Sequence, residues 1–178
     1  VSMIDGNRHT VCISSQIGCN VDCDFCATGK MGIIRNLSSG EIIEQLLIID
    51  KNINKKITNV VFMGMGEPFL NYNNVINAAK TFTNPKGFNL STKKITISTA
   101  GILPQIQKFI SEQQKYKLAI SLNASNNIIR NKIMPVNKKW DIADIIKFIL
   151  ERPENINISD LTILPRSQAS STVVNRKT

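Results

Sequence analysis

The amino-acid sequence predicts one α/β domain with a parallel sheet and helices packed on its outside. Its 178 residues, 42% of them apolar, are enough to bury a hydrophobic core. Short runs rich in Ile, Val and Thr alternate with amphipathic helical patterns, which is typical of βαβ units. Glycine or polar residues follow several of these runs, as expected where parallel strands end at a binding site.

The first half of the chain begins with a short predicted strand over residues 11–14, followed by a long polar loop. Ser38 and Glu41 have the spacing of a capping box and predict the start of a helix. Residues 57–63 form a β-branched run that predicts a buried strand. This run ends in the glycine turn 64–68.

The second half continues the alternation. Helices are predicted over 74–82, from Pro104 and after Asp141, and strands over 94–98, 116–121 and 161–164. The helix after Asp141 has the clearest pattern, with Ile142, Ile145, Ile146 and Ile149 on one face. We therefore expect residues 1–164 to form the domain and residues 165–178 to form a polar tail, for which disorder is one interpretation.

The ends of the predicted strands carry the first candidate site. Gly66-Glu67, Ser98 and Ser121 terminate apolar runs. Parallel β/α folds bind ligands at the carboxyl ends of their strands, so these residues are candidates for binding. Each of them taken alone is equally well explained by a strand end that meets water.

Charge and hydropathy limit the classes of function. Lys and Arg number 22 against 13 Asp and Glu, a net charge of +9 that fits an anionic partner such as nucleic acid or reflects a coding bias toward Lys, Asn and Ile. No apolar run approaches the ~20 residues of a membrane-spanning helix, and residues 1–9 lack the apolar centre of a secretory signal. We expect a cytoplasmic protein without a membrane partner. Because the chain starts at Val1, we also expect that an upstream part is missing.

The strongest signal is the cysteine content. The four cysteines are Cys12, Cys19, Cys23 and Cys26, and the last three form a C-x3-C-x2-C pattern in one polar loop. Three thiolates so close together are typical ligands of an iron–sulfur cluster, and three ligands leave one iron of a four-iron cluster open. A zinc site completed by His9 or Cys12 is the alternative. Inert buried thiols fit less well, because the loop is polar.

The cysteine loop resembles the motif of the radical S-adenosylmethionine (SAM) superfamily, including the aromatic Phe25 before the last cysteine. Further segments resemble the RlmN/Cfr family of radical SAM RNA methyltransferases, in the same order and with similar gaps: residues 12–19, 35–37, 58–68, 98–101, 119–124 and 135–139. The resemblance covers roughly residues 7–150. It implies a partial (β/α) barrel of radical SAM type.

The resemblance also implies roles for particular residues. Cys19, Cys23 and Cys26 would hold a [4Fe–4S] cluster whose open iron binds SAM. Gly66 and Glu67 would face the SAM amino group, and Ser98, Ser121, Leu122 and Asn123 would line the rest of the pocket. The family usually has His where Asn123 stands. Cys12 would be the catalytic cysteine that resolves a methylcysteine intermediate through a disulfide bond.

The implied activity is methylation of C2 of adenosine in 23S rRNA and tRNA, by a monomer that receives electrons from an external donor. Two expected groups have no match: no cysteine follows Cys26 to carry the methyl group, and the general-base glutamate would fall before residue 1. After about residue 155 the resemblance fades. We therefore expect a fragment or degenerate copy. The alternatives are a non-catalytic, metal-holding RNA-binding module, or a radical SAM enzyme that acts on a small substrate.

Overall fold

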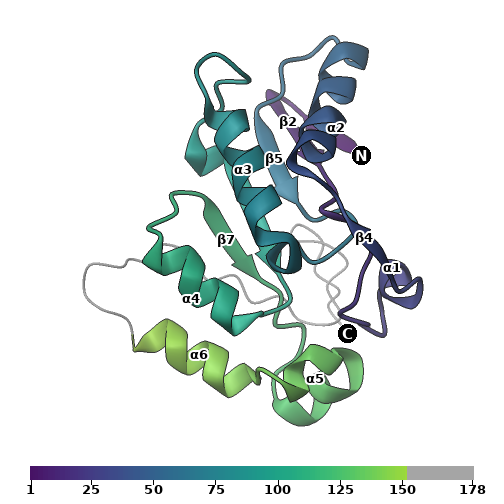
Figure 1. Cartoon of the computed structure of the whole chain (residues 1–178), viewed down its shortest axis with the longest axis vertical. Coiled ribbons are helices and arrows are strands. Elements are labelled where there is room, and N and C mark those ends of the chain that lie inside the picture. Colours follow the sequence, from purple (N-terminus) through teal and green to yellow (C-terminus); the bar gives the residue numbers. More distant parts are fainter. Residues whose placement is uncertain (152–178) are drawn as a thin grey trace, which may run out of the picture.

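The computed structural model describes residues 1–151 (Figure 1). A five-stranded sheet has the order β1-β2-β5-β6-β7, and β3 and β4 form a separate hairpin. The strands are β1 (Ser2–Asp5), β2 (Arg8–Cys12), β3 (Gln16–Gly18), β4 (Ile33–Asn36), β5 (Asn59–Phe62), β6 (Ile95–Thr99) and β7 (Lys117–Ile120). The predicted strand 161–164, the predicted tail 165–178 and the domain boundary between them lie outside the described residues.

The register of the sheet confirms the predicted α/β class. β2, β5, β6 and β7 are parallel, with Val11 opposite Val60 and Val60 opposite Ile95. β1 is antiparallel to β2 at the edge and was not predicted. The first parallel strand runs from Arg8 to Cys12, so it starts and ends earlier than the predicted range 11–14, although the Ile13 N–H still donates to the Val61 oxygen at 3.0 Å.

The helices follow the predicted order. They are α1 (Ala27–Lys30), α2 (Ser39–Asn52), α3 (Tyr72–Thr83), α4 (Leu103–Ser111), α5 (Asn127–Ile133) and α6 (Ile142–Leu150), with 3-10 turns η1 (Pro68–Asn71), η2 (Thr92–Lys94) and η3 (Pro135–Lys138). The capping box of Ser38 and Glu41 is present at the start of α2. Asp141 caps α6 by accepting the Asp144 N–H at 2.8 Å. The short helices α1 and α5 were not predicted.

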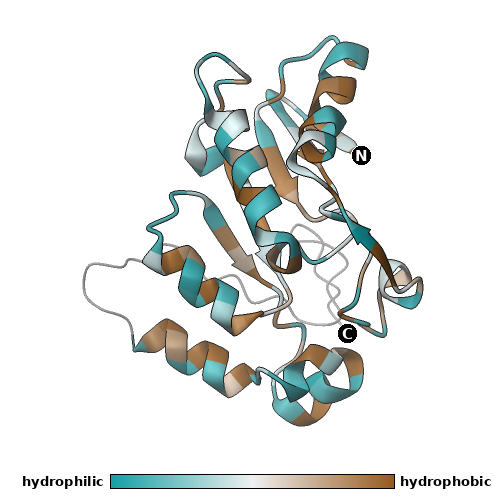
Figure 2. Cartoon of the chain, in the orientation of Figure 1, coloured by the Kyte–Doolittle hydropathy of each residue, from teal (hydrophilic) through white to brown (hydrophobic). Residues whose placement is uncertain are grey.

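The core lies between one face of the sheet and the helices. Val60 and Phe62 of β5 and Ile95 and Ile97 of β6 are buried in the same cluster as the apolar faces of α2, α3 and α4. Figure 2 shows β5 largely in hydrophobic colours, whereas α3 and α4 alternate between hydrophilic and hydrophobic stretches. Within residues 1–151, no helix combines the length and the apolar character that crossing a bilayer requires.

Candidate functional site

The sheet places the predicted strand-end residues together where its parallel strands finish, and this carboxyl-terminal end of the strands is called the sheet edge below. Cys12 is the last residue of β2, Ser98 lies one residue before the end of β6, and Ser121 directly follows β7. Side chains alternate along a strand, so Cys12 and Ser98 lie on the face opposite the buried Val11 and Ile97. Both are half-buried. The Ser98 and Ser121 hydroxyl oxygens are 3.4 Å apart.

The turn after β5 brings Gly66 and Glu67 to the same edge. Gly66 has φ +96°, and a Cβ atom there would lie 2.5 Å from the Cβ of Gln16. The Glu67 N–H donates to the Gln16 side-chain oxygen at 2.8 Å. Glycine at position 66 is therefore required both by the backbone conformation and by the close approach of Gln16.

The carboxylate of Glu67 points into the protein. Its two oxygens accept the N–H groups of Phe69 at 3.0 Å and Ala100 at 2.7 Å, and the residue is 4% exposed. Burial raises the pKa of this carboxyl, and the two backbone N–H groups and Thr99 oppose that rise. The carboxylate thus joins the turn after β5 to the end of β6. Its contact with a SAM amino group stays a prediction, and the structure shows that it also holds the turn after β5 against Ala100.

Asn123 lies in the segment that follows β7, at the far end of the row of predicted strand-end residues. It has φ +54°, an unusual value that Asn tolerates better than most residues. Its side-chain amide donates to the Met134 sulfur at 3.5 Å. The main-chain oxygen of Leu122 accepts from Arg130 Nε at 2.9 Å.

The three loop cysteines are carried by the β3–β4 hairpin and α1. Gly18, with φ +77°, ends β3, and a Cβ atom there would lie 1.8 Å from the Gly32 oxygen. The Cys19 N–H donates to that oxygen at 3.0 Å. The Cys26 N–H donates to the Cys23 oxygen at 3.0 Å. These backbone contacts fold residues 19–26, the cysteine loop, back onto itself.

The cysteine loop packs against the sheet edge. Cys19 and Cys23 are buried with Ala100 and Met134, and the half-buried Cys26 packs against them. Burial raises the pKa of Cys19, and it raises that of Cys23 to about 11 with smaller contributions from the other two loop thiols. Bonds to a metal would reverse this effect, because metal binding deprotonates thiols. All four cysteines are free thiols, so the predicted disulfide bond is not present.

The donor set fits an iron–sulfur cluster better than a single ion. Among residues 1–151, no three His, Cys, Asp or Glu side chains converge as ligands of one metal ion. A four-iron cluster does not need such convergence, since each thiolate binds a different iron. His9, the alternative zinc ligand, is buried with its Nδ1 3.0 Å from the Lys55 oxygen. Three neighbouring thiols are the ligand type of iron–sulfur clusters, and the assignment of these cysteines as the ligands stays a prediction.

Two contributors to the site were missed at the sequence level. Gln16 supports the turn at Gly66, and the fully buried Arg130 contacts the ends of β6 and β7. Gln16 stands in the polar stretch before the cysteines, and Arg130 stands among Asn and Lys residues that indicate a solvated helix. No sequence pattern marks either side chain as buried.

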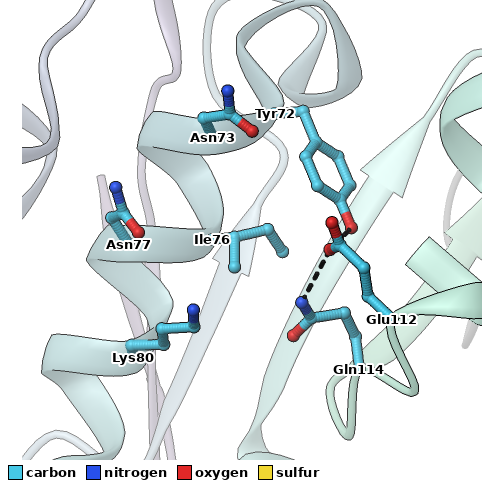
Figure 3. A pocket seen from close by; sticks show the side chains of 7 residues that line it. All are labelled: Tyr72, Asn73, Ile76, Asn77, Lys80, Glu112 and Gln114. Carbon is cyan, nitrogen blue, oxygen red and sulfur yellow. Dashed lines mark hydrogen bonds between the residues drawn. The ribbon is translucent and has the colours of Figure 1, made fainter. Parts of the chain in front are cut away.

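A groove between α3 and the turn that follows α4 lies apart from these residues (Figure 3). It has a volume of about 520 Å³ and is lined by Tyr72, Asn73, Ile76, Asn77, Lys80, Glu112 and Gln114. The Tyr72 hydroxyl donates to Glu112 at 2.6 Å, and the Gln114 amide donates to the same carboxylate at 3.0 Å. None of the predicted site residues lines this groove.

Comparison with known proteins identifies the family. The model of the radical SAM superfamily matches residues 13–166, which include the cysteine loop and the predicted strand-end residues except Cys12. The chain therefore belongs to the radical SAM superfamily, whose members use a [4Fe–4S] cluster and SAM.

Three curated relatives carry one name. The chain is 55% identical over 147 residues to the dual-specificity RNA methyltransferase RlmN of Wigglesworthia glossinidia brevipalpis, covering 79% of this chain and 38% of that protein. It is 50% identical over 144 residues to the probable RlmN of Dictyoglomus turgidum, covering 79% and 41%. It is 45% identical over 170 residues to RlmN of Buchnera aphidicola subsp. Acyrthosiphon pisum, covering 92% and 47%. The chain thus spans less than half the length of these relatives.

A solved structure agrees with this family. The crystal structure of a radical SAM methyltransferase from Sphaerobacter thermophilus superposes with a TM-score of 0.78 and 39% sequence identity. The match covers 82% of this chain and 44% of that one. The parallel sheet with its helices is therefore the partial (β/α) barrel that the resemblance implied.

Proposed function

We propose that this chain is the cluster- and SAM-binding part of an RNA methyltransferase that acts on C2 of adenosine in 23S rRNA and tRNA. The observation that carries the proposal is the packing of the cysteine loop against the ends of the strands that hold the predicted SAM residues. The names of the curated relatives support RNA as substrate and methyl transfer as reaction.

In this proposal Cys19, Cys23 and Cys26 hold the [4Fe–4S] cluster. When bound and reduced, it supplies the electron that cleaves SAM to a 5′-deoxyadenosyl radical. Cys19 and Cys23 are only 8% and 9% exposed, which limits the access of water to this part of the loop. The exposed Phe25 beside Cys26 is free to contact a ligand.

The SAM molecule is proposed to lie along the sheet edge. The tight turn at Gly66 and Glu67 lies at this edge, where the missing side chain of Gly66 makes room for Gln16, which holds the turn in place. The paired hydroxyls of Ser98 and Ser121 supply donors and acceptors. Leu122 and the amide of Asn123 complete the pocket beside them.

The partners follow from charge and chemistry. A net charge of +9 favours binding to RNA phosphates. An external donor supplies the electron, the chain acts as a monomer, and the compartment is the cytoplasm, where reducing conditions keep thiols free.

Cys12 is proposed as the resolving cysteine, since it lies at the same sheet edge. The printed sequence holds no cysteine after Cys26 to carry the methyl group. We therefore expect this chain alone to cleave SAM without methylating RNA.

The test uses residues 1–178 reconstituted anaerobically with iron and sulfide, then reduced in the presence of SAM. We expect about four irons per chain, as in a [4Fe–4S] cluster, and slow release of 5′-deoxyadenosine, measured by chromatography. Stoichiometric zinc with no sulfide would support the metal-holding module instead. Formation of 2-methyladenosine in added RNA, measured by nucleoside mass spectrometry, would contradict the expected lack of methyl transfer.

A further inference from the structure

Arg130 of α5 is 0% exposed and reaches three main-chain oxygens at the sheet edge. Its Nε donates to Leu122 at 2.9 Å, and its Nη2 donates to Ser121 at 3.3 Å and to the Ala100 oxygen. Ala100 follows β6, and Ser121 and Leu122 follow β7. One guanidinium group therefore ties together the two strand ends that carry the proposed SAM residues.

The remaining nitrogen of Arg130 faces a second set of groups. Nη1 donates to the side-chain oxygen of Asn137 at 2.7 Å and to the Trp140 oxygen at 3.4 Å. The Asn137 amide in turn donates to Asn127 at 3.0 Å and Asn131 at 2.7 Å. The guanidinium is thus held in one orientation by groups from the end of the sheet and from the turn before α6.

This buried cation contacts no carboxylate in the part of the chain that the structure describes. Its hydrogen-bond partners there are main-chain oxygens and one amide, and the ion pairs among residues 1–151 involve other residues. A buried charge without a counter-charge is costly, and buried Arg is rarely found without an acidic partner. Neutral hydrogen bonds satisfy its donors, so its charge is balanced only by groups that do not contact it, which include Asp141.

The cysteine loop lies beside this charge. Arg130 Nη2 donates to the Ala100 oxygen, and Ala100 packs with Cys19, Cys23 and Met134. The Asp24 N–H donates to the Ile133 oxygen at 2.9 Å, which fastens the loop to the end of α5. The arginine and the thiols are therefore parts of one packed unit.

We propose that Arg130 is a positioning residue that holds the SAM-binding ends of β6 and β7 and supplies the positive charge that balances the thiolate-ligated cluster. This inference rests on the proposed function. Three thiolates give a bound [4Fe–4S] cluster a net negative charge, and reduction adds another. A fixed cation beside the cluster favours the reduced form, because net charge and nearby hydrogen bonds set cluster potentials.

The test separates charge from hydrogen bonding with Arg130→Lys and Arg130→Gln, and with Asn137→Ala as a control that perturbs the network while keeping the charge. Each reconstituted protein is assayed for iron and sulfide, for midpoint potential by EPR-monitored titration, and for SAM dissociation constant. Arg130→Gln is expected to lower the reduced-to-oxidised ratio at a fixed potential about tenfold, a shift of about 59 mV for one electron. Asn137→Ala is expected to keep the wild-type potential.

Arg130→Lys keeps the positive charge, so its midpoint potential is expected to stay close to that of the wild-type chain. Its SAM binding is expected to weaken about tenfold, since an ammonium group cannot bond the three carbonyl oxygens in a planar fork. An unchanged SAM affinity in Arg130→Lys overturns the positioning role, even where Arg130→Gln does not fold. An unchanged potential in folded, iron-replete Arg130→Gln overturns the charge role. Failure of the wild-type chain to take up iron and sulfide instead refutes the proposed function itself.

Discussion

The two halves of the candidate site are built on different physical principles. The cysteine loop is held by backbone hydrogen bonds and by a small apolar cluster around Met134. The strand ends are held by two buried ionisable side chains, Glu67 and Arg130, each of which bonds main-chain groups of neighbouring segments. One half is therefore held mainly by local main-chain bonds, and the other by side chains that reach across neighbouring segments.

This difference predicts how each half fails. Damage to the cysteine loop should remove the cluster and leave most of the fold intact, because the main core lies between the sheet and α2, α3 and α4. Damage to the strand ends should reduce both stability and SAM affinity, because the same hydrogen bonds serve both. Three predictions test this contrast, starting with the largest expected effect, and a fourth concerns a reference position away from both halves.

Replacing Cys19, Cys23 or Cys26 by Ala should abolish the [4Fe–4S] cluster, because each thiolate is expected to bind one iron. Cys12→Ala serves as the matched control and should keep full iron and sulfide, since Cys12 lies at the end of β2. Iron and sulfide content and visible absorption measure the outcome. An equal loss in Cys12→Ala would contradict the ligand assignment.

Gly18→Ala should prevent the cysteine loop from folding back, since its Cβ would lie 1.8 Å from the Gly32 oxygen. Gly32→Ala is the control: it also has positive φ (+67°), but a Cβ there meets nothing within 4 Å. The control should cost about 1–2 kcal/mol of backbone strain. Gly18→Ala should cost more and lose the cluster, as measured by urea unfolding and iron content.

Equal effects of the two glycine substitutions would show that only backbone conformation matters at this hairpin. The close approach of Gly18 to Gly32 would then have no part in forming the loop.

Glu67→Gln should lower the free energy of unfolding by about 1–3 kcal/mol, because one accepting oxygen becomes an NH₂ group that cannot accept the N–H of Phe69 or Ala100. SAM affinity should fall with it, since Glu67 joins the turn at Gly66 to Ala100. Iron content should stay unchanged. Denaturant unfolding and equilibrium dialysis with SAM measure the two quantities, and a wild-type SAM affinity would contradict the positioning role.

The smallest effect is expected at the capping box of α2, away from both halves. Arg35 holds the pKa of the Glu41 carboxyl at about 2, below its ordinary value of 4.5. The ionised form is therefore favoured in the folded state, and its contribution is complete above pH ~4.5 and lost as the pH falls toward 2. Because Glu41 is exposed to solvent, this contribution is small.

Urea unfolding between pH 3 and 6 tests this contribution, with Glu41→Gln as the variant that lacks the titrating group. The wild-type chain should lose its advantage over Glu41→Gln as the pH is lowered. A constant difference across this range would contradict the assignment to Glu41.

The sequence by itself determined the α/β class, the order of the parallel strands and the cysteine loop. Alternating patterns report on local structure, and cap residues such as Ser38 and Asp141 act within a single turn of helix. The spacing of Cys19, Cys23 and Cys26 is likewise local. Each of these signals lies within a few consecutive residues, so it can be found without knowledge of the fold.

Only the tertiary structure decided which way the polar side chains of the strand ends face. Glu67 stands at the expected position, but its carboxylate turns inward, where it accepts the N–H groups of Phe69 and Ala100. Arg130 stands in a polar stretch, yet its guanidinium is buried, where it donates to three carbonyl oxygens from two strand ends. Both outcomes depend on the main chain of Ala100, which is 33 residues from Glu67 and 30 from Arg130, and whose position is set when the sheet and α5 pack together.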